Sequence, residues 1–208
     1  MKEKKNDKML GFRFLRCLLK PLFIAYYNPK IIGKENIPKD GPILICANHI
    51  HLMDQCMPLI STKRVVKYMA KKEYFDDKKV SWFFKIAGCI PVNRQAKDND
   101  ATNAALNFLN SGGAIGIFPE GTRNKTDKII QDFKFGAVSM AQKTGAKIVP
   151  CGIYGDYKFR SKNLSMVIGK PFVVNKNEDL AVVNVNFQKE VVNLIYEAKK
   201  LSKKKQLD

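Results

Sequence analysis

The chain has 208 residues, and its 37 Lys and Arg against 19 Asp and Glu give a formal net charge of +18. With 45% hydrophobic and 27% charged residues it is long enough for one domain with a sizeable core, which excludes disordered and fibrous classes. Its five cysteines form no CxxC pair, which argues against a disulfide scaffold or a zinc ribbon and favours a reducing compartment.

A strongly apolar segment follows the first eight residues. Residues 9–27 are nearly all apolar apart from Arg13, Arg16 and Lys20, whose spacing puts the three cations on one face of a helix. These charges and Pro21 argue against a membrane-spanning helix, and the small residues of a signal-peptide cleavage site are missing. We therefore expect an amphipathic helix that lies at a membrane surface. A helix docked on the protein's own core remains the alternative.

Short apolar runs separated by turn residues follow. They predict strands at 30–32, 42–47, 65–69 and 88–92, a turn at 38–41 that joins the first two, and a helix after His51. The run at 42–47 is continuously apolar, as in a strand that is buried on both faces of a sheet.

The second half alternates helices and strands. Asp100 is a candidate N-cap for a helix that ends near 111–113, and 135–144 reads as a helix ending at Gly145. Strands are expected at 114–118, 148–153 and 165–168, and a last amphipathic helix carries apolar residues at Phe187, Val191, Leu194, Ile195 and Ala198.

This order predicts an α/β fold, a single layered domain with a mostly parallel or mixed sheet flanked by helices. The expected divisions are the amphipathic segment 1–29, the layered domain 30–200 and a Lys-rich tail 201–208.

Three polar clusters directly follow predicted strands, at 48–54, 93–94 and 120–123. Because active sites of open α/β sheets gather at the carboxyl ends of the strands, we expect the three clusters to meet. Together they make a stronger signal than any of them alone.

His49 and Asp54 are the candidate catalytic pair of the first cluster. On a straight helix they would lie about 140° apart, so they meet only if His49 sits on the loop before the helix. An imidazole oriented by a carboxylate acts as a general base. A surface histidine beside a helix-capping aspartate is the other interpretation. His49, His51 and Asp54 also have metal-ligand spacing, but the chain holds no further histidine, so we predict no metal.

Cations are the candidate binding groups for a phosphate. Arg94 and Arg123 follow buried strands, where a guanidinium forms charge-assisted hydrogen bonds with phosphate oxygens. Lys71 and Lys134 lie in or near such loops as well, although the sequence favours a solvated surface position for each lysine taken singly.

The motifs resemble those of the 1-acylglycerol-3-phosphate acyltransferase (PlsC-like) family of glycerolipid acyltransferases. NHIHLMD at 48–54 resembles its NHxSxxD block, which carries the HxxxxD pair, and GCIPVNR at 88–94 resembles the block that ends in a substrate-binding arginine. FPEGTR at 118–123 matches the third block letter for letter, and 148–153 resembles the fourth. The order and spacing agree over roughly residues 30–155.

The resemblance implies transfer of a fatty acyl group from acyl-CoA or acyl-carrier protein to the sn-2 hydroxyl of lysophosphatidate, without a bound cofactor. His49 would deprotonate the hydroxyl, and Asp54 would orient and charge-stabilise His49. The implied substrate-binding residues are Arg94, Arg123, Lys71, Lys134, Glu120, Gly121 and Thr122. His51 departs from the family, which usually has a small residue there.

The implied partners are the membrane lipid lysophosphatidate, the acyl donor and an anionic membrane surface. The expected location is peripheral or monotopic, on the cytoplasmic face of a membrane. Glycerol-3-phosphate or another lysophospholipid is an alternative acceptor. The charge of +18 also suits a nucleic-acid-binding protein. We expect no nucleic acid partner, because Tyr74, Phe75 and Trp82 read better as core or lipid-facing residues than as a base-stacking surface.

Overall fold

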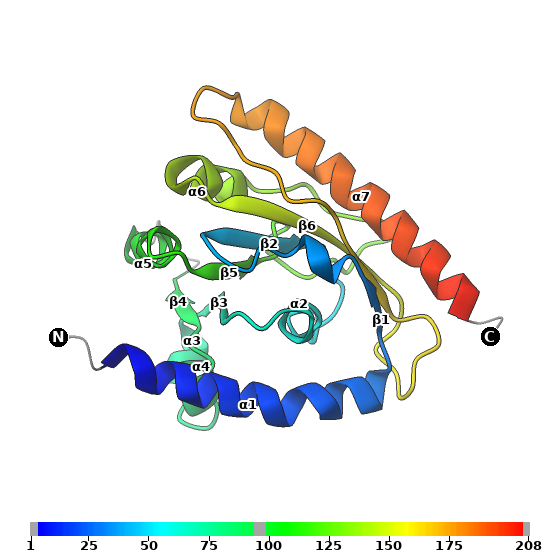
Figure 1. The fold of residues 1–208 in the computed structure, drawn as a ribbon, viewed down its shortest axis with the longest axis horizontal. Helices are drawn as coiled ribbons and strands as arrows, with labels where there is room; N and C mark the ends of the chain where they lie inside the picture. The colour runs from blue at the N-terminus through cyan, green and yellow to red at the C-terminus, as the bar shows by residue number, and fades with distance from the viewer. Residues whose placement is uncertain (1–3, 94–98, 206–208) are drawn as a thin grey trace.

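The computed structural model describes residues 4–93 and 99–205, and a mixed sheet lies at its centre (Figure 1). Within these residues seven strands pair in the order β1-β7-β6-β2-β5-β3-β4. Their bounds are β1 Lys30–Ile32, β2 Ile43–Ala47, β3 Val66–Lys71, β4 Ile90–Val92, β5 Ala114–Ile117, β6 Lys147–Tyr154 and β7 Ser165–Ile168. The β6–β7 pair is antiparallel and the other pairs of this sheet are parallel.

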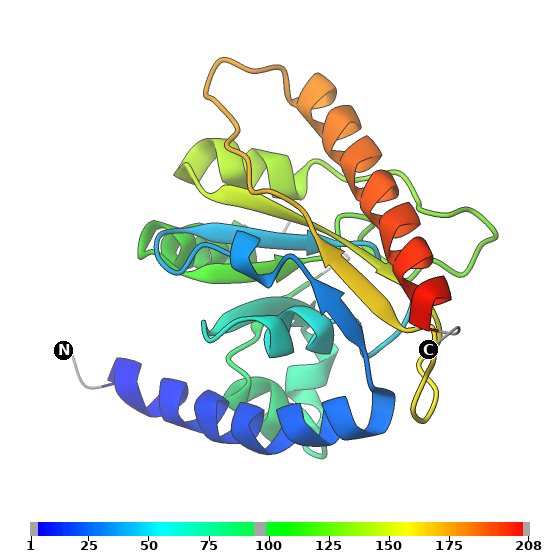
Figure 2. The same ribbon diagram turned by 45° about the vertical axis from the view of Figure 1, so that its right-hand side comes forward.

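Helices cover both faces of the sheet. Their bounds are α1 Lys4–Tyr27, α2 Cys56–Ser61, α3 Glu73–Asp76, α4 Ser81–Ile86, α5 Asn99–Asn110, α6 Gly136–Thr144 and α7 Leu180–Lys205, with a 3-10 turn η1 at Lys34–Asn36. Helices α5, α6 and α7 pack on one face. Helix α2 lies on the opposite face, and α1 runs along the outside of α2 and α4 (Figure 2).

The central strand β2 supplies side chains to both faces of the sheet. Leu44 and Cys46 enter the hydrophobic cluster under α5, α6 and α7, whereas Ile43, Ile45 and Ala47 enter the cluster on the α2 side. Every residue of β2 is buried. This explains its unbroken apolar sequence, because alternate side chains of a strand point to opposite faces.

The predicted fold class is confirmed; the order of the strands was left open by the sequence, and one helix cap was predicted wrongly. Strands β1 and β2 are not neighbours, since β1 pairs with β7 at the edge of the sheet. Between them Gly33 takes a φ of 78° and approaches the carbonyl of Ile168 so closely that a Cβ would lie 2.1 Å from it. Asp100 lies inside the first turn of α5 instead of at its N-cap, a position where a carboxylate still favours the helix dipole.

No element was predicted for residues 73–86, where the structure has α3 and α4. Each has six residues or fewer, too short for a helical repeat to be visible in the sequence. Their aromatic residues stack on one another: the rings of Tyr74 and Phe84 lie 4.9 Å apart at an angle of 7°.

Helix α1 presents apolar side chains on two sides. Phe12 and Phe23 are buried against the protein, whereas Phe14 (73%) and Leu10 (62%) are among its most exposed residues, together with Leu18. No helix in the described part of the chain is long and apolar enough to span a membrane. The sequence placed the cations of α1 among lipid headgroups. In the structure Arg13 is exposed, but Arg16 and Lys20 line the cavity beneath the helix.

Candidate active site

Asn48 fixes the point where the chain leaves β2. Its amide nitrogen donates to the carbonyl of Ile153 at 2.9 Å, and its amide oxygen accepts the N–H of the same residue at 2.7 Å. The buried side chain thus forms two hydrogen bonds with the backbone at the end of β6, just beyond the last paired residues of β2 and β6. The loop that begins at His49 therefore starts from a rigid position.

This loop brings His49 onto Asp54. The Nδ1 atom of His49 lies 2.8 Å from Oδ2 of Asp54, and the same oxygen accepts the backbone N–H groups of Ile50 and His51, each at 2.7 Å. Asp54 has no exposed surface. The two residues meet because His49 precedes the turn that leads into α2, which confirms the geometry expected from the sequence.

The second oxygen of Asp54 is bound by a residue that the sequence did not indicate. The hydroxyl of Tyr157 donates to Oδ1 of Asp54 at 2.7 Å. Burial, together with the charge of Asp54, raises the pKa of the Tyr157 phenol well above its usual value, so the phenol stays protonated and able to donate. The ring of Tyr157 stacks on the imidazole of His51, with the centroids 4.4 Å apart and the planes at 15°.

Glu120 of the FPEGTR segment holds the backbone of His49. Its carboxylate accepts the N–H of His49 at 2.6 Å and the N–H of Gln131 at 2.9 Å, while the carbonyl of His49 accepts the N–H of Asn124 at 2.7 Å. Burial raises the pKa of the Glu120 carboxyl despite these two donors. We expected Glu120 to contact substrate, but it is buried and both of its oxygens bind backbone, which gives it a positioning role.

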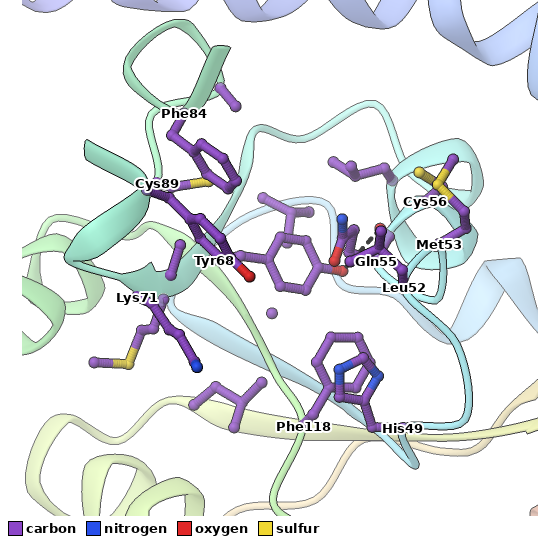
Figure 3. Close-up of a pocket in the computed structure, with 18 of the residues that line it drawn as sticks. His49, Leu52, Met53, Gln55, Cys56, Tyr68, Lys71, Phe84, Cys89 and Phe118 are labelled. Carbon is purple, nitrogen blue, oxygen red and sulfur yellow. Dashed lines mark hydrogen bonds between the residues drawn. The ribbon is translucent and has the colours of Figure 1, made fainter. Parts of the chain in front are cut away.

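His49 opens into a cavity of about 1480 Å³. Its ring stacks on Phe118 (Figure 3). The ring centroids are 4.1 Å apart, and 16% of the His49 side chain is exposed. The other expected site residues that line the same cavity are Lys71, Gly121, Thr122, Arg123 and Lys134. Arg94 lies outside the described residues, and its neighbour Asn93 lines the cavity. The strand-end clusters therefore meet, as the sequence predicted.

The turn at Gly121 shapes this end of the cavity. Gly121 has a φ of 75°, in the left-handed region that favours glycine. A Cβ on it would lie 2.9 Å from the end of the Lys134 side chain. The backbone of the FPEGTR segment thus lets the Lys134 amine lie close to the turn that also carries Arg123.

The remaining walls of the cavity are largely apolar. Helix α1 contributes Leu15 and Leu19. The ring of Tyr68 stacks on Phe118 with the centroids 5.8 Å apart, and Phe84 lies farther from His49 (Figure 3). Tyr68 fits because Gly116 has no side chain: a Cβ there would lie 2.2 Å from the Tyr68 ring. Nothing in the sequence indicated that α1 forms a wall of the cavity, or that Arg16 and Lys20 line the cavity with it.

The arrangement suits acid–base chemistry. With Nδ1 of His49 bound to Asp54, Nε2 is the nitrogen left to exchange a proton with a group in the cavity, and the carboxylate stabilises the imidazolium that results. Within the described residues, His, Cys, Asp and Glu side chains form no group of three that could hold a metal ion.

Comparison with known proteins agrees with this chemistry. A family model described as Acyltransferase matches residues 28–154. The chain belongs to the acyltransferase family. This acyltransferase is similar to the 1-acyl-sn-glycerol-3-phosphate acyltransferase of Borreliella burgdorferi, with 31% identity over 185 residues, 87% of this chain and 74% of the relative. It is also similar to the enzyme of that name from Bacillus subtilis, with 30% identity over 77% of this chain and 81% of the relative.

A solved structure has the same fold as this acyltransferase. The 1-acyl-sn-glycerophosphate acyltransferase PlsC from Thermotoga maritima superposes with a TM-score of 0.76, covering 97% of this chain and 83% of the other at 22% identity. The family and the enzyme class expected from the sequence are thus confirmed. The matched range contains His49, Asp54 and Glu120, whereas Tyr157 lies beyond its end.

Proposed function

We propose that this acyltransferase moves a fatty acyl group from a thioester, acyl-CoA or acyl-carrier protein, to the sn-2 hydroxyl of 1-acylglycerol-3-phosphate. The product would be phosphatidate, a precursor in phospholipid synthesis. The observation that carries the proposal is the junction of three features in one cavity: the His49–Asp54 pair, a group of cations and long apolar walls. The names of the related proteins point to the same acceptor.

In the proposed reaction Nε2 of His49 removes the proton of the lipid hydroxyl as its oxygen attacks the thioester carbonyl. The new C–O ester bond forms and the C–S bond breaks. The thiolate that leaves takes up the proton held by the imidazolium, so His49 ends each turnover neutral. Asp54 stabilises the imidazolium between these two proton transfers. Both substrates occupy the site together, so no acyl-enzyme intermediate is needed.

Lys71, Lys134 and Arg123 are the proposed ligands of the acceptor's phosphate. Their side chains are exposed into or beside the cavity that contains His49. A guanidinium and ammonium groups bind phosphate oxygens through charge-assisted hydrogen bonds. Arg94 is proposed for the same role on the basis of its motif. The main chain at Gly121 and Thr122 would shape the space around the phosphate.

We further propose that α1 rests on the cytoplasmic face of a membrane, as a peripheral or monotopic element. The supporting observation is the exposed apolar row formed by Leu10, Phe14 and Leu18 on the side of α1 that faces away from the protein. The opposite side of the same helix lines the cavity. An acceptor lipid and its product would then pass between bilayer and site over a short distance.

The experiment that tests the proposal is a matrix of acyl donors against acceptors with purified protein. We expect transfer to 1-acylglycerol-3-phosphate to exceed transfer to glycerol-3-phosphate and to other lysophospholipids, and the new ester to be at the sn-2 position. Comparable or higher turnover with glycerol-3-phosphate would replace the proposed acceptor. His49→Ala serves as the blank for each donor and acceptor.

A further inference from the structure

The two oxygens of Asp54 receive different kinds of partner. Oδ2 is bound by His49 and by two backbone N–H groups of its own loop. Oδ1 is bound by the hydroxyl of Tyr157, which is 103 residues away in the sequence. Among the hydrogen bonds of the described residues, the Tyr157 hydroxyl is the one side-chain donor to Asp54 that comes from another part of the chain. It therefore holds the carboxylate oxygen that the loop of His49 leaves without a hydrogen bond among those of the described residues.

The ring of Tyr157 is held on two sides. On one side it stacks on His51, whose Nδ1 accepts the N–H of Met53 at 3.2 Å and so is itself fixed in the loop. On the other side it meets helix α1, where its ring lies edge-on to Tyr27 at 5.5 Å and to Phe23 at 6.5 Å. Aromatic contacts of this geometry stabilise a ring orientation as well as burying it.

The loop that carries Tyr157 is tied to α1 through its backbone as well. The N–H of Arg160 donates to the carbonyl of Tyr26 at 2.5 Å. Arg160 adopts a φ of 46°, a left-handed conformation that is unusual for a residue with a side chain and persists where the surroundings enforce it. The contact of Phe159 with Tyr26, at 5.2 Å between ring centroids, adds a second connection.

From these contacts we infer that Tyr157 is a positioning residue for the His49–Asp54 pair, clamped between His51 and helix α1. It acts through Asp54 and need not touch substrate. A buried carboxylate that loses a donor becomes costly to keep ionised, and its orientation toward the imidazole is no longer fixed. His51, the residue that departs from the family pattern, is part of this arrangement: its imidazole forms the flat surface on which the tyrosine ring lies.

The inference rests on the proposed acyl transfer for its kinetic test, in which Tyr157→Phe removes only the hydroxyl. We expect kcat to fall by roughly 10- to 100-fold, as for loss of a hydrogen bond to a charged group, with the KM of both substrates within about twofold of wild type. Tyr196→Phe, on the exposed surface of α7, is the matched control for loss of a hydroxyl and should leave kcat unchanged. Thermal unfolding of both variants shows that they are folded.

A double-mutant cycle separates positioning from a merely structural effect. His51→Ser removes the stacking surface, and we expect it to lower kcat in the wild-type background. In the Tyr157→Phe background the same change should have little further effect on kcat, because the bond that the stack supports is already gone. If the effects of the two substitutions on kcat were fully additive, His51 would not act through Tyr157, and the inference would be contradicted.

A readout without substrate distinguishes failure of this inference from failure of the proposed function. The chain has two histidines, so ¹⁵N-labelled imidazole signals are assigned with the single variant His51→Ser. We expect the nitrogen shifts of His49 to change in Tyr157→Phe and to stay unchanged in Tyr196→Phe. If they change while wild type fails to acylate lysophosphatidate, the proposed acceptor is wrong and the positioning role stands. If wild type is active and Tyr157→Phe matches it within twofold in kcat, or raises KM alone, the inference is overturned.

Discussion

The imidazole of His49 and the carboxylate of Asp54 are joined at 2.8 Å although five residues separate them. A regular helix would hold them on different faces, and they meet because the chain turns between β2 and α2. Three further groups fix this turn: Asn48 binds β6, Glu120 binds the N–H of His49, and Tyr157 binds the far oxygen of Asp54. The pair is therefore oriented before any substrate enters.

Asp54→Asn tests the charge of the pair while preserving its shape. The amide oxygen retains an acceptor for the loop, but the imidazolium loses its stabilising negative charge. We expect kcat to fall by about 10²- to 10⁴-fold, as for loss of general acid–base assistance. Single-turnover acyl transfer measures the effect, with thermal unfolding as a check of the fold. Wild-type turnover in Asp54→Asn would show that the carboxylate has no electrostatic role.

Glu120 gives stability a defined dependence on pH. Burial raises its pKa above the ordinary value of 4.5, so the folded protein binds a proton at Glu120 more tightly than the unfolded chain does. Its contribution to stability is therefore fully present below that value and is lost as the pH rises through the folded pKa.

Glu120→Gln removes this ionisation. We expect the free energy of unfolding of wild type, relative to Glu120→Gln, to decrease as the pH rises from below 4.5, by at most about 1.4 kcal/mol for each pH unit in the window. Denaturant titrations of both proteins at a series of pH values measure the difference. A relative stability that increases with pH across the same window would mean that the two backbone donors outweigh burial.

Gly116→Ala tests the cavity wall formed by Tyr68. A methyl group at this position would lie 2.2 Å from the Tyr68 ring, so the ring must move. Because Tyr68 belongs to the apolar wall of the cavity, along which we propose that the acyl chain lies, we expect the ratio of palmitoyl to octanoyl transfer to change by about tenfold. The double variant with Tyr68→Ala relieves the clash and should bring this ratio back toward that of Tyr68→Ala alone. An unchanged ratio in Gly116→Ala would place the acyl chain elsewhere.

The outer row of α1 predicts membrane binding by insertion. Phe14→Glu with Leu18→Glu should reduce binding to phosphatidylcholine vesicles at high salt by more than about tenfold, because burial of each large apolar side chain contributes roughly 1.5–3 kcal/mol. The matched control is Val182→Glu with Val185→Glu, which adds the same charge to exposed positions of α7. Equal binding by the two double variants would contradict an orienting role for α1.

The sheet was predictable where the sequence contains long apolar runs. Strand β2 is the clearest case, because a strand buried on both faces has no polar position to interrupt it. The place of β1 was not predictable. Its three residues carry no pattern, and its partner β7 lies more than a hundred residues away in the chain. The short helices α3 and α4 were not predicted, because one or two helical turns are too short to show a periodic pattern of apolar residues.

The candidate site was predictable as far as local motifs reach. His49, Asp54 and the FPEGTR segment are marked by residue type, spacing and position after strands, and the structure brings them together. Tyr157 left no such signal, since it lies in an irregular loop and finds Asp54 only through the fold. The same holds for Arg16 and Lys20, whose side chains line the cavity only because α1 docks as it does.

Acyl transfer by purified His49→Ala is the most direct test of the catalytic role of this residue. With lysophosphatidate and a saturating acyl thioester, we expect turnover to drop by at least about 10²-fold while thermal unfolding stays within a few degrees of wild type. Turnover near the wild-type rate in a folded His49→Ala protein would mean that another group takes the proton from the hydroxyl.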